Sequence, residues 1–342
     1  HTLTEPEFAS VRADLSEALR GDARNPVVHY NLGALLYQRY SEQLTQDAIS
    51  HFTVAFSASF HDDDPETLFV AGLSLTGLSL SYAQLFHRFG HVRDEVLVNC
   101  RITASRAVEM LGGLLDSTGD PALVPPLLRA RHAEAFSLHV TEQPADVEAA
   151  ITIYEDVVAG WEGFDGRVPA VVLNNLGYQY MALEGRDEPG CAPEAYDRAA
   201  ALFERAIEVE HDFEMAWANL GNVQRLLKQH AAAERSYRNA AAAADSQGRK
   251  YPPAHSEIAR LFLEQGRVAE AEAEHRRALE LTESPPAAAK VHGEWADALQ
   301  AVNRDSEALA AAERGLAEWP GEQRCAAIVA RLQAGTEHEG AR

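Results

Sequence analysis

The sequence contains few cysteines, and its basic residues are far outnumbered by acidic ones. The three cysteines, Cys100, Cys191 and Cys325, lie far apart and are odd in number, which argues against a disulfide framework and for a reducing compartment. We therefore expect a cytoplasmic protein. The 30 lysines and arginines stand against 52 aspartates and glutamates, so the formal net charge is -22. A surface of this charge repels phosphate, which argues against nucleic acid and anionic membrane and favours a basic partner.

Long apolar runs and the motifs of common enzymes are also missing. No apolar run approaches the roughly 20 residues that a membrane helix needs, so we expect no membrane partner. The chain has no phosphate loop, no dinucleotide fingerprint and no HExxH, CxxC or GxSxG sequence. We therefore predict that the protein is not an enzyme and has no cofactor.

What the sequence does contain is a pattern of large and small residues that returns four times between Ala170 and Pro320. In each copy, apolar residues three and four apart form the stripe of one helix, and a second helical stripe follows. A small residue in the middle of a helix lets its partner approach closely. One such hairpin cannot bury its stripe alone, so the copies must stack.

The four copies keep the order and the spacing of these positions. The aromatic residues Phe203 and Tyr237 are about 34 residues apart, as are Ala206 and Ala240. The pattern residues are Leu173, Leu176, Gly177, Tyr180, Ala199, Phe203 and Ala206; Trp217, Leu220, Gly221, Ala233, Tyr237 and Ala240; His255, Ile258, Ala259, Phe262, Ala271, His275 and Ala278; and His292, Trp295, Ala296, Leu299, Ala308, Ala312, Gly315 and Pro320.

This pattern resembles the tetratricopeptide repeat (TPR). A further copy precedes it, built on His29, Leu32, Gly33 and Leu36 and then on Ala48, Phe52 and Ala55. The resemblance implies an all-α fold, a right-handed α-solenoid of stacked helical hairpins that together form a TPR-like superhelix.

The spacing of the stripes and turns divides the chain into five predicted segments. These are a half-repeat or capping helix at 1–25, a TPR-like repeat at 26–64, irregular longer hairpins at 65–169, TPR-like repeats at 170–320, and a capping helix with a frayed tail at 321–342. Within the irregular segment we expect helices at 65–89 and 92–111 joined at Gly90, a turn-rich connector at 112–126, and a junction at 161–169. A polar insertion at 184–194 is expected at the edge of the array, where functional loops are often found.

The resemblance also implies where a partner would bind. In TPR arrays the first helix of each repeat lines the concave side, and a peptide or a helix of the partner lies along that groove. Mapped onto this chain, the inward side chains are Tyr30, Tyr37, Asn174, Tyr178, Met181, Asn222, Arg225, Arg260 and Asp297. We predict a noncatalytic scaffold or adaptor that binds a protein or peptide there. For any one of these residues, an ordinary solvated position remains the alternative.

Two narrower interpretations of the sequence are less favoured. Some TPR arrays clamp a chaperone carboxylate with lysine and asparagine; Asn222 matches one clamp asparagine, but Ala218 stands in place of the lysine. The pairs Glu208 with His211 and Glu272 with His275 have a spacing found in metal sites. His275 stands where the repeat has an aromatic ring, so we predict packing or surface roles for these histidines and no bound metal.

Three other functions stay open from the sequence. The chain could be a regulatory or assembly domain excised from, or acting with, a larger enzyme. It could be a peptide-sensing regulator, although the DNA-binding helix-turn-helix typical of that class is not visible. It could also be a helical enzyme that uses the region from Pro65 to Trp161, which the repeat explains least.

Overall fold

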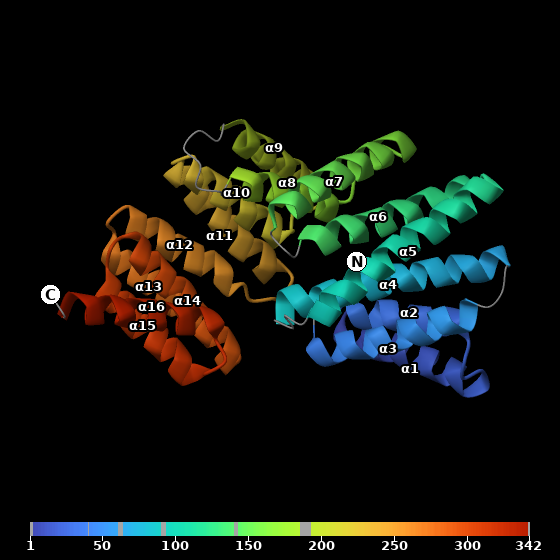
Figure 1. Ribbon diagram of the computed structural model, residues 1–342, viewed down its shortest axis with the longest axis horizontal. Helices are drawn as coiled ribbons and strands as arrows, with labels where there is room; N and C mark the ends of the chain where they lie inside the picture. Colours follow the sequence, from blue (N-terminus) through green and yellow to red (C-terminus); the bar gives the residue numbers. More distant parts are fainter. Residues whose placement is uncertain are drawn as a thin grey trace. The chain divides into compact units, whose positions relative to one another are not determined.

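The computed structural model describes residues 3–39, 41–60, 64–89, 94–139, 143–184 and 193–340. These residues form sixteen α-helices and one short 3₁₀ helix, without a strand (Figure 1). They fall into two compact units, unit 1 up to Val168 and unit 2 from Pro169. The predicted joint at Gly90 and the middle of the predicted insertion, residues 185–192, lie outside the described residues.

Unit 1 is a succession of antiparallel helices, each packed on the next. Its helices are α1 (Glu5–Gly21), α2 (Pro26–Tyr37), α3 (Glu42–Ser59), α4 (Pro65–Phe89), α5 (Asp94–Thr118), η1 (Pro121–Leu123), α6 (Val124–His139) and α7 (Pro144–Phe164). One core cluster includes Leu36, Phe52 and Leu111, which are each 2% exposed or less. The ring of Phe52 fills the space left by two glycines, because a Cβ at Gly33 or Gly77 would lie 2.8 or 2.5 Å from it.

Helix starts in unit 1 follow from local sequence. Asn25 precedes α2 and its side chain accepts a hydrogen bond from the backbone N–H of Val28 at 3.1 Å, while Pro26 occupies the first turn. Thr4 and Glu7 form a capping box at the start of α1. These short-range signals explain why these two boundaries can be located from sequence.

The turn-rich connector predicted at 112–126 is wrong over most of its length. Helix α5 continues through Gly112 and Gly113 to Thr118, and α6 begins at Val124. The glycines cost helix stability, but Leu111 and Leu114 on either side of them are buried in the unit, and this burial keeps the segment helical.

Helix α4 is more apolar than the sequence analysis allowed. Among the described residues, Pro65–Phe86 is long and apolar enough, by length and composition, to cross a membrane. In this unit 61% of its apolar window is buried, and α4 packs against α2, α3, α5 and α6. Burial against four helices accounts for its hydropathy without a bilayer.

Unit 2 consists of four helical hairpins and a terminal helix. The hairpins are α8 (Ala170–Glu184) with α9 (Pro193–Val209), α10 (Glu214–Leu226) with α11 (His230–Ser246), α12 (Pro252–Glu264) with α13 (Val268–Glu280), and α14 (Pro285–Ala301) with α15 (Asp305–Glu318). The last helix, α16 (Gln323–Gly340), packs on α14 and α15. It extends through most of the segment predicted as a frayed tail from Thr336, so that boundary is wrong as far as Gly340.

The small positions of the repeat lie at helix crossings, as predicted. A Cβ at Gly177 would lie 2.8 Å from the ring of Phe203, and one at Gly221 would lie 2.6 Å from the ring of Tyr237. In the later copies the corresponding residues Ala259 and Ala296 are 1% and 0% exposed. The large and small residues of each pair therefore come from the two helices of one hairpin.

The histidines of the two Glu-x-x-His pairs pack against tryptophans. The His275 ring stacks on Trp295 with centroids 4.8 Å apart, and His211 meets Trp217 edge-on at 5.6 Å. His275 therefore has the predicted packing role, and the exposed His211 contacts Trp217 at the surface.

Candidate functional site

The first helices of unit 2 offer a continuous surface. The first helices of the four hairpins, α8, α10, α12 and α14, lie side by side in chain order, and each contacts the first helix of the next hairpin (Figure 1). We call their polar side chains the first-helix face: Asn174, Asn175, Tyr178, Asn219, Asn222, Arg225, Ser256, Glu257, Arg260, Glu264, Glu294 and Asp297.

Amide side chains connect the first two helices of this face. The Nδ2 of Asn219 on α10 donates to the Oδ1 of Asn174 on α8 at 3.0 Å. Asn174 in turn donates to the Oδ1 of Asn175 at 3.3 Å, and both α8 asparagines are buried. Because a buried amide must be hydrogen-bonded, these contacts hold α8 and α10 in a fixed relation.

Charged side chains connect the next two helices. Arg225 on α10 donates from Nη1 to the Oε1 of Glu264 on α12 at 2.6 Å, and the Arg225 side chain is 14% exposed. Behind this pair, the Tyr237 hydroxyl donates to the Oδ1 of Asn222 at 2.8 Å. Tyr237 also fills the space over Gly221, so the same side chain contacts both the first-helix face and the repeat core.

Several polar atoms at this point are shielded from solvent and have no hydrogen-bond partner within the described part of the chain. They are Arg225 Nε, Ser256 Oγ, Glu257 Oε2, Arg260 Nε and Glu264 Oε2. Arg260 Nε and Glu257 Oε2 are 3.7 Å apart, an ion pair that is too long for a hydrogen bond. A buried polar atom without a partner costs about 1–3 kcal/mol, so a ligand that reaches these atoms and offers both donors and acceptors would lower that cost.

Burial also changes the acid–base behaviour of these groups. Burial raises the pKa of Glu257, and the guanidinium groups of Arg260 and Arg225 oppose that rise. Burial lowers the pKa of Arg225, but Tyr237 and the carboxylate of Glu264 more than offset it, so the pKa is raised overall. Arg225 therefore keeps its charge on this face.

The structure separates the predicted groove residues. Tyr30 and Tyr37 belong to α2 of unit 1, where both pack against the core and the Tyr30 ring lies 5.9 Å from that of Phe52. The other seven belong to unit 2. Tyr178 and Met181 are partly buried on α8, and Asp297 on α14 forms an ion pair with Arg324 of α16 at 3.5 Å.

Sequence reasoning missed a second polar position on each first helix. Asn175, Asn219, Glu257 and Glu294 each stand two residues before the small residue of their copy, that is before Gly177, Gly221, Ala259 and Ala296. A polar residue two positions before the small residue in all four copies is a signal that could have identified them. Predicting each groove residue separately, without comparing the four copies, does not reveal this recurrence.

Comparisons with known proteins agree with this architecture. No protein-family model matches the sequence, and neither does any curated protein. Among solved structures, yeast Tom70 is similar with a TM-score of 0.52 and 13% identity, over 96% of this chain and 77% of that one. A tetratricopeptide repeat protein from Parabacteroides merdae has a TM-score of 0.47 and 13% identity over 82% of this chain and 98% of that one.

A third similar structure is considerably longer than this chain. In the APC/C hetero-tetramer Cut9-Hcn1 the matching chain has a TM-score of 0.44 and 15% identity, and the match covers 97% of this chain but 60% of that one. The helical hairpins, the small residues at their crossings and the similarity to Tom70 together show a TPR-like solenoid fold.

Proposed function

We propose that this protein is a noncatalytic scaffold or adaptor, and that the first-helix face of unit 2 binds a segment of a partner protein. The observation that carries the proposal is the group of shielded, unpartnered donors and acceptors on α10 and α12, around Arg225, Glu257 and Arg260. A polypeptide main chain presents N–H donors and C=O acceptors along its length, so it can satisfy atoms of both kinds.

The charge of the protein and of this face favours a partner segment with basic residues. The net charge of -22 attracts a basic partner over a distance. On the face itself, Glu294 of α14 places a carboxylate beyond the Arg225 and Arg260 pairs, whereas the Asp297 carboxylate is paired with Arg324. We therefore expect the bound segment to place its cations along α14.

The face is largely preorganised for binding. The Asn219–Asn174 and Arg225–Glu264 hydrogen bonds join successive first helices before any partner arrives. A rigid surface pays little ordering cost on association. The affinity then depends on the partner segment, which must become ordered.

The proposal is tested by capture of partners from the native host. Arg225→Ala combined with Arg260→Ala is compared with Arg238→Ala combined with Arg277→Ala, which removes two arginines that lie on α11 and α13 and are 53% and 56% exposed. We expect a partner identified by mass spectrometry to be lost with the first pair and kept with the second, with helical circular dichroism unchanged. Equal capture by both variants would contradict the proposal.

The same experiment separates the other functions considered from the sequence. A captured enzyme whose activity depends on this chain would indicate a regulatory or assembly role with that enzyme. Capture of short free peptides would indicate a peptide-sensing regulator. Loss of capture on deletion of 185–192, with the face intact, would move the site to that insertion.

A further inference from the structure

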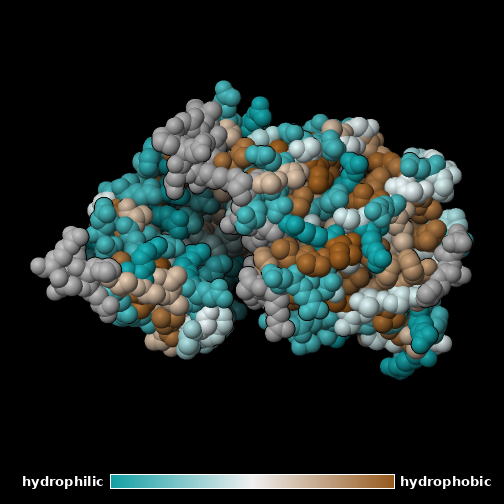
Figure 2. Space-filling model, in the orientation of Figure 1, coloured by the Kyte–Doolittle hydropathy of each residue, from teal (hydrophilic) through white to brown (hydrophobic). Residues whose placement is uncertain are grey.

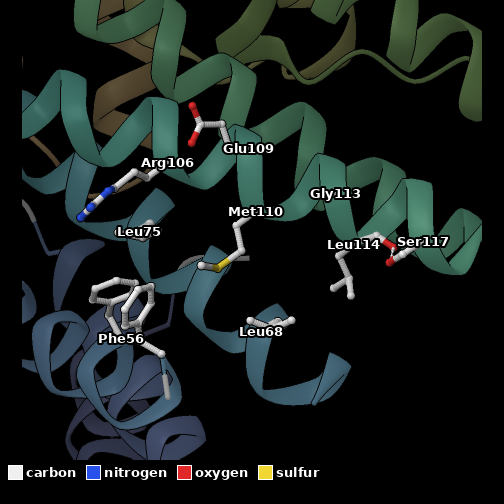
Figure 3. A pocket seen from close by; sticks show the side chains of 10 residues that line it. Phe56, Leu68, Leu75, Arg106, Glu109, Met110, Gly113, Leu114 and Ser117 are labelled. Carbon is white, nitrogen blue, oxygen red and sulfur yellow. Dashed lines mark hydrogen bonds between the residues drawn. The ribbon is translucent and has the colours of Figure 1, made fainter. Parts of the chain in front are cut away.

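A second candidate surface lies in unit 1, among α3, α4 and α5 (Figure 3). Helices α3 and α5 both pack against α4 and, in the described residues, have no close backbone contact with each other. A hollow of about 420 Å³ therefore remains between them, above the N-terminal half of α4. One wall of the hollow is formed by the last turns of α5, from Arg106 to Ser117.

The lining of this hollow is mainly apolar. Met110 and Leu114 point from α5 toward Leu68 of α4, and Phe56 lies on the α3 side (Figure 3). The rings of Phe56 and Phe60 are 5.2 Å apart. Phe60 is nevertheless 52% exposed, and the hollow is open to solvent on one side. Contiguous apolar surface of this kind marks an interaction site more often than an isolated exposed residue does.

Other apolar side chains near this wall are also exposed. Val98 and Ile102 of α5 are 51% and 49% exposed, and they precede Arg106 at four-residue spacing along the helix. On the face drawn in Figure 2, apolar side chains gather over α4 to α6. Exposed apolar side chains therefore also occur along the earlier part of α5.

Gly113 leaves open space over this wall of the hollow. It stands inside α5, where glycine costs roughly 0.5–1 kcal/mol relative to alanine. A Cβ at Gly72 or Gly77 would collide with Leu111 or Phe52, whereas a Cβ at Gly113 would meet nothing within 4 Å. Packing within the chain therefore does not require a glycine at position 113. A helix from outside can approach this wall closely at Gly113, because a small residue permits close backbone approach.

The rim carries one charge of each sign. Arg106 and Glu109 line the hollow three residues apart on α5, both are exposed, and within the described part of the chain neither has an ion-pair partner. Figure 3 shows Glu109 pointing away from the hollow, while the Arg106 guanidinium lies beside it. An occupant that carries a carboxylate next to its apolar side chains would pair with Arg106.

We propose that this hollow docks an amphipathic helix of a partner protein, with two large apolar side chains one turn apart in the hollow and an acidic residue opposite Arg106. A helix fits because the lining runs along α5 from Arg106 to Ser117, and because the backbone of a docked helix would close the open side. A small molecule would leave much of its surface in water, whereas ligand pockets usually bury about 70–90% of a ligand. This surface belongs to unit 1 and does not depend on the first-helix face of unit 2.

The test uses the full chain and a phage-displayed library of 18-residue amphipathic helices with randomised apolar and acidic positions. Selection against the wild-type protein is followed by counter-selection against Gly113→Gln. Glutamine is a good helix former that enters open space at this position, so the fold is kept while the wall is blocked. Gly163→Gln is the matched control, because Gly163 is also a helical glycine with nothing within 4 Å of its Cβ.

Selected peptides are then synthesised with fluorescein and their dissociation constants are measured by anisotropy. We expect large apolar residues one turn apart, at least tenfold weaker binding to Gly113→Gln, and unchanged binding to Gly163→Gln. Arg106→Glu should weaken binding at least fivefold, and replacing the acidic residue of the peptide by lysine should restore it.

Three results would overturn the proposal. One is the absence of any peptide enriched over the Gly113→Gln counter-selection. Another is an enriched peptide that binds Gly113→Gln as tightly as wild type. The third is stoichiometric binding of dodecanoate, abolished by Gly113→Gln, without selection of any helix, which would make the hollow a site for an apolar carboxylate.

Discussion

At the scale of the residue, glycines inside helices have opposite effects according to what lies over them. A Cβ at Gly221 would lie 2.6 Å from the fully buried ring of Tyr237, whose hydroxyl is held by Asn222. We expect Gly221→Leu to lower the free energy of unfolding by about 1–3 kcal/mol through overpacking. Gly113→Ala, with open space over it, should raise the unfolding free energy by roughly 0.5–1 kcal/mol.

Urea denaturation followed by circular dichroism measures both variants. The pair is informative because each replaces a helical glycine, so backbone entropy and helix propensity change in the same direction in both. A Gly221→Leu protein as stable as wild type would show that the repeat register around Tyr237 is wrong. A loss of stability in Gly113→Ala would show that the space over α5 is filled within the chain.

His275 should make the stability of unit 2 depend on pH. Burial, with smaller contributions from His292, Arg314 and Arg276, lowers the pKa of His275 to about 3. The unfolded chain takes up this proton near pH 6.5, before the folded one does. The contribution of His275 to stability is therefore complete above about pH 6.5 and is lost as the pH falls toward about 3.

His275→Phe should remove part of this dependence. The phenyl ring keeps an aromatic partner for Trp295, so we expect little change in the unfolding free energy at pH 8 and a gain relative to wild type that grows between pH 6.5 and pH 4.5. Some dependence should remain, because burial also lowers the pKa of His292. Parallel stability curves for the two proteins over this range would rule out the buried neutral state of His275.

At the scale of the element, α1 is held mainly at its first turn. Arg39 donates from Nη2 to the backbone carbonyl of Leu3 at 3.1 Å, pairs with Glu5 at 3.0 Å, and lies 4.2 Å over the ring of Phe8. Among the described helices, α1 packs only against α2. We expect Arg39→Ala to lower amide protection of α1 by about tenfold and leave α4 and α5 unchanged.

Hydrogen exchange with mass spectrometry measures this effect. Arg20→Ala is the control, because Arg20 lies on α1 itself in an ion pair with Glu17 in which both side chains are well exposed, and such pairs contribute little. Equal loss of protection in the two variants would mean that α1 is sensitive to any charge change rather than held by Arg39.

The elements that sequence predicted well are those whose partners lie within one hairpin. The pairing of Gly177 with Phe203 and of Gly221 with Tyr237 could be predicted because both members recur at a fixed interval. The end of α5 could not be predicted, because Gly112 and Gly113 are turn signals locally and their helical state depends on burial of the neighbouring leucines. The extension of α16 beyond Thr336 has no comparable signal in the repeat pattern.

The candidate site shows the same limit. Its location on first helices follows from the repeat, but the interactions that organise it join different copies, as with Asn219 and Asn174 or Arg225 and Glu264. Such pairs have no fixed sequence interval that marks them. Tyr30 and Tyr37 fit the same position rule, yet they lie in the other unit, because the rule takes no account of where one compact unit ends.

At the scale of the whole molecule, the excess of negative charge should oppose folding. Many ion pairs of the fold have at least one exposed member, as in Arg238 with Glu234, where the Arg238 side chain is 53% exposed, and pairs near the solvent contribute at most about 1 kcal/mol each. Repulsion among the unbalanced charges of a chain with net charge -22 acts over longer distances and destabilises the compact state. Repulsion should therefore outweigh the pairs in the salt dependence of stability.

We expect the thermal midpoint to rise by several degrees when sodium chloride is increased from 0.01 to 0.1 M, since the screening length falls from about 30 to about 10 Å over this range. The concentration stays low enough for screening, rather than salt effects on apolar burial, to dominate. Sodium chloride and potassium chloride should give the same rise, because screening depends on ionic strength and not on the ion. A midpoint that falls with salt would mean that the attractive pairs dominate, and the net charge would then be no guide to the basic partner proposed for the first-helix face.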